Sequence, residues 1–306
     1  MYKLWILLLV LVPLALVSGS SSDNSWTSDL FLHGSLASNN PPIQYWSSGF
    51  SHNPSGDVII FSPGAGLDHH SFDAQVLPLV IAGYRVITYD PRCQGLSQWS
   101  IPAVKANCTI TFDLMLQDMV EIFSSLAIPP EQQVIQAGLS MGGMLAQQFS
   151  KVYPDRTKAL LAMDCGPNEE LLPWMQYYLE TSLDTLIASD NNASFNAILN
   201  TSNKTLVRQE IFNELNLSGD AEIVKAMKAC ATVVTEDVNF ARLQIPELLI
   251  YGQLDNLTNA SMIAWYARDI ANPHISLVSI PNAGHVSSLD NPNSVNQALV
   301  NFLTSI

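Results

Sequence analysis

Residues 133–142 of the chain read QVIQAGLSMG, an apolar segment that runs into glycines on both sides of Leu139-Ser140-Met141. The apolar residues 133–137 predict a buried strand, and the residues from Met141 onward predict a helix. So sharp a turn from strand to helix needs glycine at its flanks, because side chains there would clash. The stretch therefore predicts that the hydroxyl of Ser140 is presented at the edge of a sheet.

A serine hydroxyl is a weak nucleophile until a base accepts its proton, and that base needs an orienting carboxylate. Asp255 ends the segment YGQLD and His285 ends the segment PNAGH, each just past a predicted strand. The order Ser, Asp, His along the chain suits a nucleophile on such a turn. We predict Ser140 as the nucleophile, His285 as the base and Asp255 as the acid. Asp290 is the alternative acid, because Asp255 alone would also suit a simple turn.

The other histidines fit the role of the base less well. None of them follows a late strand in a turn of small residues, although two of them, in the first long loop, are candidates for lining a pocket. These residues are His33, His52, His69, His70 and His274, of which His69 and His70 are the pocket candidates.

Acyl transfer also requires hydrogen-bond donors aimed at the developing oxyanion, each contributing about 3 kcal/mol. The backbone N–H of Met141, next to the nucleophile, is the first predicted donor. The second is the amide of Ala65 in the segment SPGAG at residues 62–66, whose glycines allow the backbone to approach a ligand closely. An ordinary glycine-rich turn is the alternative interpretation of this segment.

Around these residues, short apolar strands alternate with helical stretches, which predicts an α/β fold with a mostly parallel, doubly wound sheet. An opening hairpin at residues 30–36 and 43–48 is also predicted. The six remaining predicted strands are Asp57–Phe61, Tyr84–Tyr89, Gln133–Ala137, Lys158–Met163, Glu247–Tyr251 and Ile275–Ile280.

The alternation stops between Cys165 and Leu243, where the residues read as helices separated by polar turns. One of these predicted helices, Asn168–Glu180, places its apolar residues on one face. We therefore predict a helical cap insertion at 166–242 within a core formed by 20–165 and 243–306. Since ligands of open α/β sheets bind beyond the carboxyl ends of the strands, the insertion is expected to roof a pocket.

The first 19 residues have the layout of a secretory signal peptide. Lys3 precedes an apolar run of 14 residues, which is shorter than the roughly 20 that span a bilayer, and small residues follow near Gly19. Seven Asn-X-Ser/Thr sequences support a glycosylated protein of the secretory pathway, secreted or held in a lumen such as a lysosome or vacuole. The seven asparagines are Asn107, Asn192, Asn200, Asn203, Asn216, Asn256 and Asn259.

In such a compartment the four cysteines allow two disulfides in three possible pairings. We favour Cys93 with Cys108, and Cys165 with Cys230, because the second bridge would join both ends of the insertion. Buried free thiols are the alternative.

The composition excludes several classes of function. The chain has 306 residues, 48% of them hydrophobic, and a formal net charge of −14, which argues against binding to nucleic acid or to anionic membranes. We expect no stable membrane anchor once the leader is removed. Neither metal-ligand spacing nor a dinucleotide-binding glycine motif follows any strand, so no cofactor and no metal is expected. The composition leaves the oligomeric state open.

Taken together, the chain resembles the α/β-hydrolase family, in particular small capped members similar to 3-oxoadipate enol-lactonase and related esterases. The segment DPRCQGLS at 90–97 is similar to the family's Asp-X-Arg-Gly-X-Gly-X-Ser pattern, with Cys93 in place of the usual glycine. The oxyanion segment has Pro63 where the family usually has histidine. Asp118 and the residues 126–128 also match the helix that leads to the nucleophile strand.

The resemblance implies hydrolysis of a carboxylic ester or lactone of a small molecule by an acyl-enzyme route, without a cofactor. Serine at the nucleophile position disfavours the branches of the family that use aspartate there. Two alternatives remain. The first is a cofactor-free perhydrolase or lyase on the same fold, and the second is a non-enzymatic receptor or binding protein, which would not need all three catalytic side chains.

Overall fold

The structure is a computed structural model that describes residues 29–37, 39, 41–98, 107–167, 173–190, 193–199, 202–234, 245–261, 263–264 and 274–306. Three predictions lie wholly or partly outside these residues. They concern the leader, two of the predicted glycan-accepting asparagines (Asn192 and Asn200), and residues 168–172 of the predicted helix 168–180.

The described strands form one sheet in the order β1-β2-β4-β3-β5-β6-β7-β8. β1 pairs antiparallel with β2, and β2 pairs antiparallel with β4, whereas every other neighbouring pair is parallel. The predicted mostly parallel sheet is therefore confirmed. The strands are β1 (Leu32–Leu36), β2 (Ile43–Ser48), β3 (Val58–Ser62), β4 (Arg85–Tyr89), β5 (Val134–Leu139), β6 (Thr157–Met163), β7 (Glu247–Gly252) and β8 (Ile275–Ile280).

The central strands are buried on both faces, which is why they read as continuous apolar runs in the sequence. In β3, Val58 and Ile60 belong to the apolar core on one side of the sheet, while Ile59 and Phe61 belong to the core on the other side. This alternation follows from the period of two in an extended chain.

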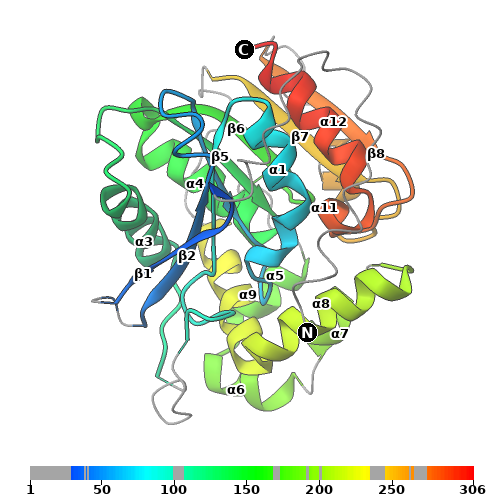
Figure 1. Ribbon diagram of the computed structural model, residues 1–306. Coiled ribbons are helices and arrows are strands. Elements are labelled where there is room, and N and C mark those ends of the chain that lie inside the picture. The colour runs from blue at the N-terminus through cyan, green and yellow to red at the C-terminus, as the bar shows by residue number, and fades with distance from the viewer. Residues whose placement is uncertain are drawn as a thin grey trace.

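Helices cover both faces of the sheet (Figure 1). On one face lie α3 (Phe112–Ser125) and α4 (Met141–Val152), which contact each other. On the other face lie α1 (Asp73–Ile81), α11 (Ser287–Asp290) and α12 (Pro292–Leu303), which also contact one another. Two short 3-10 helices lie in connections between the sheet and its helices, His69–Phe72 between β3 and α1 and Pro154–Arg156 between α4 and β6.

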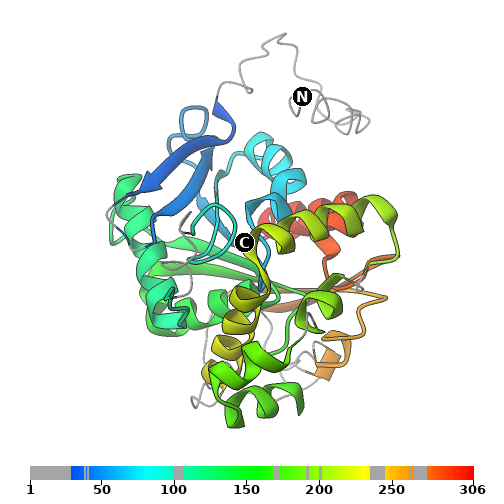
Figure 2. The same cartoon turned by 90° about the horizontal axis from the view of Figure 1, so that it is seen from below.

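Between β6 and β7 the described residues form five helices, α5 (Pro173–Glu180), α6 (Leu183–Ser189), α7 (Ala193–Leu199), α8 (Thr205–Ser218) and α9 (Asp220–Val234). We call these five helices the helical insertion. They gather at one end of the sheet in Figure 1 and lie in front of it in Figure 2, where α8 and α9 are yellow-green and yellow. α9 is the centre of the group, because it packs against α5, α6, α7 and α8 as well as against α4 of the core.

One predicted disulfide is confirmed and the other is wrong. Cys93 and Cys108 are bridged, joining the turn after β4 to the segment before α3. Cys165 and Cys230 are instead free and buried in the same apolar core cluster. Burial raises the pKa of both thiols, so little of the reactive thiolate forms, and the two side chains pack as small apolar groups.

None of the helices within the described residues is long and apolar enough to span a membrane. This finding concerns only that part of the chain, which does not include the predicted leader.

Candidate active site

Ser140 lies between β5 and α4 with φ 53° and ψ −119°, a left-handed conformation that a residue with a side chain rarely adopts. Both flanking glycines are required by close backbone packing. A Cβ on Gly138 would overlap the backbone of Gly142, and a Cβ on Gly142 would overlap the carbonyl group of Ser62. The backbone N–H of Ser140 donates to Met163 O at 2.9 Å, which fixes the turn to the end of β6.

His285 follows β8 and connects two other predicted residues. Its Nε2 lies 2.9 Å from Ser140 Oγ, and its Nδ1 lies 3.0 Å from Asp255 Oδ2. An ionised carboxylate can only accept, so Nδ1 carries the proton and the lone pair of Nε2 faces the serine hydroxyl. The arrangement can therefore transfer the hydroxyl proton to the imidazole while the carboxylate holds the ring.

Asp255 is fixed by further donors in its own loop. Its Oδ1 accepts from the N–H of Leu257 at 2.8 Å, and its Oδ2 accepts from Thr258 Oγ1 at 2.6 Å. Burial alone would raise the pKa of Asp255, but His285 and these donors outweigh burial and lower it to about 2. The carboxylate is thus ionised at every pH at which the protein would work.

Burial favours neutral His285, but the neighbouring Asp255 carboxylate outweighs burial and raises the pKa of the imidazole above its ordinary value. The imidazolium that would form on proton transfer is therefore stabilised where it forms. The alternative acid, Asp290, has different partners: it accepts from Gly284 N at 2.7 Å and from Ser202 Oγ at 2.5 Å.

The two predicted oxyanion donors belong to segments that adjoin the nucleophile. Met141 begins α4, and the loop that contains Ala65 reaches Ser140, since a Cβ built on Gly64 would lie 3.4 Å from Ser140 Cβ. Both Ala65 and Met141 are buried, and no acceptor within the described part of the chain takes either N–H. Two amides at these positions suit a developing oxyanion.

Sequence reasoning missed the polar side chains that hold the Ala65 loop. The N–H of Gly66 donates to Gln94 Oε1, and its carbonyl accepts from Ser218 Oγ at 2.7 Å. Ser218 belongs to α8 of the helical insertion and also accepts from Gly95 N at 3.1 Å. The family-like segment 90–97 contains Gln94, but nothing in the sequence connects Ser218 to it, because these contacts join residues more than 100 positions apart.

A second histidine-carboxylate contact lies at His69. Its Nδ1 is 2.7 Å from Asp90 Oδ1, and its ring stacks on Trp46 with the centroids 3.4 Å apart. Asp68, His69 and His70 are also close enough together to offer ligands to a metal ion, with ligand atoms within 4.8 Å of one another. Carboxylates already occupy Nδ1 of both histidines, through Asp90 and Asp73.

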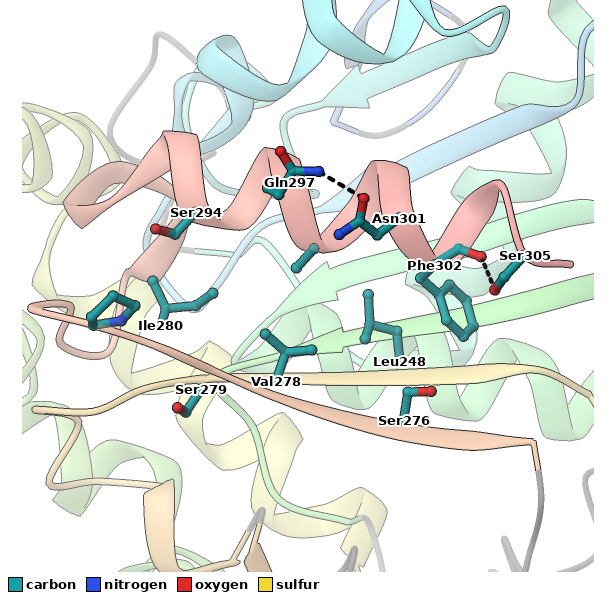
Figure 3. Close-up of a pocket in the computed structure, with 12 residues that line it drawn as sticks. Leu248, Ser276, Val278, Ser279, Ile280, Ser294, Gln297, Asn301, Phe302 and Ser305 are labelled. Atoms are coloured by element: carbon teal, nitrogen blue, oxygen red, sulfur yellow. Dashed lines mark hydrogen bonds between the residues drawn. The ribbon is translucent and has the colours of Figure 1, made fainter.

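A pocket of about 500 Å³ lies away from these residues, between α12 and the last two strands (Figure 3). Leu248, Val278, Ile280 and Phe302 supply its apolar walls, and uncharged polar side chains such as that of Asn301 supply the rest. None of the five predicted site residues lines it, so it is not the site of the predicted chemistry.

Comparisons with known proteins identify the family of the chain. A family model described as "Serine aminopeptidase, S33" matches residues 53–291, which is more than three quarters of the chain. A "Putative non-heme chloroperoxidase" of Synechocystis sp. is 26% identical over 263 residues, covering 81% of this chain and 91% of that protein.

Solved structures show the same fold. A thermophilic esterase from Thermogutta terrifontis has a TM-score of 0.71 at 23% identity, covering 89% of this chain and 98% of that one. An enol-lactonase from Burkholderia xenovorans LB400 has a TM-score of 0.62 at 18% identity, covering 89% of this chain and 100% of that one. With the family match over residues 53–291, the chain belongs to the α/β-hydrolase family, in the group that the serine aminopeptidase S33 model describes.

Proposed function

We propose that the protein is a serine hydrolase that cleaves a carboxylic ester or lactone of a small molecule through an acyl-enzyme intermediate. The observation that carries the proposal is the unbroken hydrogen-bond chain from Ser140 through His285 to Asp255. A receptor without catalysis would not require a strained serine aligned with a buried, carboxylate-bound imidazole.

In the first half of the reaction, Ser140 Oγ attacks the substrate carbonyl carbon while His285 Nε2 takes the hydroxyl proton. The amides of Met141 and Ala65 receive the oxyanion. Collapse of this intermediate breaks the bond to the leaving oxygen, which takes the proton from His285, and leaves the acyl group on Ser140. Water then attacks the acyl group in the same way, so the acid is released and the hydroxyl of Ser140 is restored.

A fluorophosphonate probe tests the nucleophile directly. We expect the purified protein to be labelled with one probe per chain, and Ser140→Ala to remain unlabelled with an unchanged circular dichroism spectrum. If the folded wild-type protein is not labelled, the proposal is wrong and a binding function gains support. A series of p-nitrophenyl esters of increasing acyl length, together with lactones, then identifies the substrate class.

Peracid formation is a second candidate, supported by the name of the Synechocystis relative. In that reaction hydrogen peroxide replaces water as the attacking group on the acyl-enzyme, giving a peracid and free Ser140. Competition between water and peroxide at a fixed ester concentration distinguishes the two. A product ratio that follows the solution ratio of the two nucleophiles would reject a dedicated perhydrolase.

We also propose that the protein enters the secretory pathway. The disulfide Cys93–Cys108 supports an oxidising compartment, and Asn107, Asn203 and Asn216 lie exposed as glycan acceptors require. Expression in eukaryotic cells should give a mature chain that starts near residue 20 and becomes smaller on treatment with an N-glycosidase. A full-length, unglycosylated product would contradict this assignment.

A further inference from the structure

Asp164, which sequence reasoning did not select, directly follows β6 and is bonded to the segments that carry Asp255 and His285. It is fully buried, and its two carboxylate oxygens are used separately. Oδ1 accepts from Gly252 N at 2.8 Å, and Oδ2 accepts from Ser287 N at 3.0 Å. One carboxylate therefore joins two segments that are 35 residues apart in the chain.

These two segments carry the residues that act on Ser140. Gly252 ends β7 three positions before Asp255, and Ser287 begins α11 two positions after His285. The segments also touch directly, because Leu254 N donates to Ala283 O at 2.8 Å. The single side chain of Asp164 can therefore set the position of the loop that carries Asp255 relative to the loop that carries His285.

The backbone around Asp164 is tied to the nucleophile as well. The carbonyl of the preceding residue, Met163, accepts from Ser140 N at 2.9 Å, and Asp164 N donates to Ile250 O at 2.8 Å. Asp164 itself has φ 47°, in the left-handed region that aspartate adopts more readily than most residues with a side chain.

Asp164 also acts through its charge. Burial, together with the charge of Asp255, raises the pKa of Asp164 to about 7, while His285 opposes this. In return, the Asp164 charge adds to that of Asp255 in raising the pKa of His285. Two other titratable groups lie nearby. The neighbouring Cys165 is a buried thiol whose raised pKa keeps it neutral. Asp290, on α11, accepts from the N–H of Gly284, the residue before His285.

We propose that Asp164 is a positioning residue of the reaction: it fixes the Asp255 and His285 loops against the nucleophile turn, and when it is ionised it adds a second negative charge that favours the imidazolium. It is not the triad acid, because Nδ1 of His285 is bonded to Asp255. The inference rests on the proposed hydrolase function, since positioning matters only if His285 accepts a proton from Ser140.

The test is Asp164→Asn. The asparagine oxygen can accept from only one of the two N–H groups, and its NH₂ faces the other, so the two loops lose their common acceptor. We expect kcat/KM to fall about 10- to 100-fold through kcat, with KM nearly unchanged, because small displacements of reacting groups have effects of this size. In the part of the acidic limb near and above pH 7, where wild-type Asp164 becomes ionised, the variant should reach its activity plateau at a lower pH, because neutral His285 is favoured when that charge is absent.

Asp29→Asn is the matched control. Asp29 is also buried and accepts from two backbone N–H groups, those of Ser51 and His52, but it lies beside the β1–β2 side of the sheet. It should lower thermal stability without moving the pH–rate profile. A loss of activity in Asp164→Asn with an unchanged acidic limb, or the same shift in both variants, would overturn the inference.

Two measurements separate this inference from the proposed function. If wild-type protein is not labelled by the fluorophosphonate, the hydrolase function fails, yet NMR titration of labelled histidine still reports whether the His285 pKa falls in Asp164→Asn. If that variant does not fold, the wild-type protein suffices: the amide protons of Gly252 and Ser287 should be protected from exchange and should shift together as Asp164 titrates. Rapid exchange of these amides, or independent shifts, would contradict the assignment.

Discussion

Ser140 holds a conformation that costs about 1–3 kcal/mol for a residue with a side chain. The sheet and α4 impose it, because the Ser140 backbone is bonded to Met163 O and both flanking glycines pack against backbone atoms. The strain places Oγ within reach of His285 before any substrate arrives. Preorganisation of this kind is what a nucleophile on a rigid turn requires.

Replacing Gly142 should therefore be severely destabilising. In Gly142→Ala the new Cβ would overlap the Ser62 carbonyl, so β3 and α4 would have to separate, at a cost of at least about 3 kcal/mol. Urea unfolding monitored by circular dichroism measures the loss. Gly166→Ala is the control, because its Cβ would come only to 3.2 Å from Ser261 Cβ, a distance that a small shift relieves. Equal stability of the two variants would contradict the packing argument.

Asp255→Asn tests two roles of Asp255, which are to orient the His285 imidazole and to stabilise its protonated form. The neutral amide can present its NH₂ to Nδ1, which leaves the wrong tautomer facing Ser140, so kcat/KM should fall by about 10⁴. Loss of the charge should also lower the pKa of His285, because Asp255 is the principal group that raises it. The pH dependence of fluorophosphonate labelling checks both effects. A variant that is labelled at the wild-type rate would remove Asp255 from the mechanism.

At the scale of residues, the sequence indicates those catalytic candidates that stand in a recognisable turn directly after a predicted strand. Ser140 stands in a glycine pattern after a strand, and Asp255 and His285 stand in turns after late strands. Asp164 and Ser218 could not be found in this way, because the backbone groups described above that bond to their side chains lie 88 or more positions away along the chain. The Cys165–Cys230 prediction failed for a related reason: a pattern of cysteines does not show whether the thiols point toward each other or into the core.

At the scale of elements, α8 is bound to the core through buried polar contacts. Glu214 Oε2 accepts from Asp68 N at 2.9 Å and from Ser71 Oγ at 2.8 Å, one turn before Ser218 reaches the Ala65 loop. Glu214 Oε1 is buried with no partner within the described residues. Burial and the Asp68 charge raise the pKa of Glu214 well above its ordinary value, so the folded protein holds this proton to a higher pH than the unfolded chain does.

Glu214→Gln should therefore stabilise the protein at high pH. As pH rises above about 4.5, the unfolded chain releases a proton from this side chain while the folded protein retains it, so wild-type stability falls. Glutamine cannot titrate and keeps an acceptor for Asp68 N, so the variant should melt a few degrees higher than wild type at pH 8. The advantage should shrink at pH 5.

Differential scanning calorimetry over this pH range measures the effect. The exposed Glu121 on α3 supplies the control, since Glu121→Gln removes the same charge without altering a buried contact. A stability difference between Glu214→Gln and wild type that does not change with pH would show that Glu214 is ionised in the folded state.

The central strands were predictable because burial on both faces makes each of them a short apolar run. β8 has the predicted bounds, and the ends of β3 and β5 differ from the predicted ends by one or two residues. The arrangement of the helical insertion was not predictable in the same way. Its helices are fixed by contacts with α9 and with loops of the core, which leave no periodic signal in the sequence.

At the scale of the whole molecule, the side chains whose pKa values are shifted by folding favour the folded state at mildly acidic pH. Among the residues that the structure describes, five carboxyl groups have raised pKa values, and their contribution to stability declines as the pH rises from the ordinary pKa toward the raised pKa of the folded state. They are Asp68, Asp118, Asp164, Glu210 and Glu214. His70 and His285 also have raised pKa values, so their contribution is present below about 6.5 and is lost as pH rises.

Asp29 and Asp255 act in the opposite sense, because their pKa values are lowered and their contribution is lost as pH falls below about 4. Stability is thus lost below about pH 4 and above about pH 6.5, so we expect the melting temperature to be highest between these limits, near pH 5. Activity should rise with pH through the raised pKa of His285, so the two optima should differ. Melting curves and pH–rate profiles in the same buffers check this, and coincident optima would contradict the assignment of charges.

The site also has an order of assembly. Ser140 and His285 are 145 positions apart, and the strand that precedes the histidine, β8, is added at the edge of the sheet after all the others in the chain. During synthesis the nucleophile turn emerges long before its base, and domains begin to fold from the N-terminal side. A growing chain would therefore carry an inert serine until its last strand docks, which delays any hydrolysis until the protein is nearly finished.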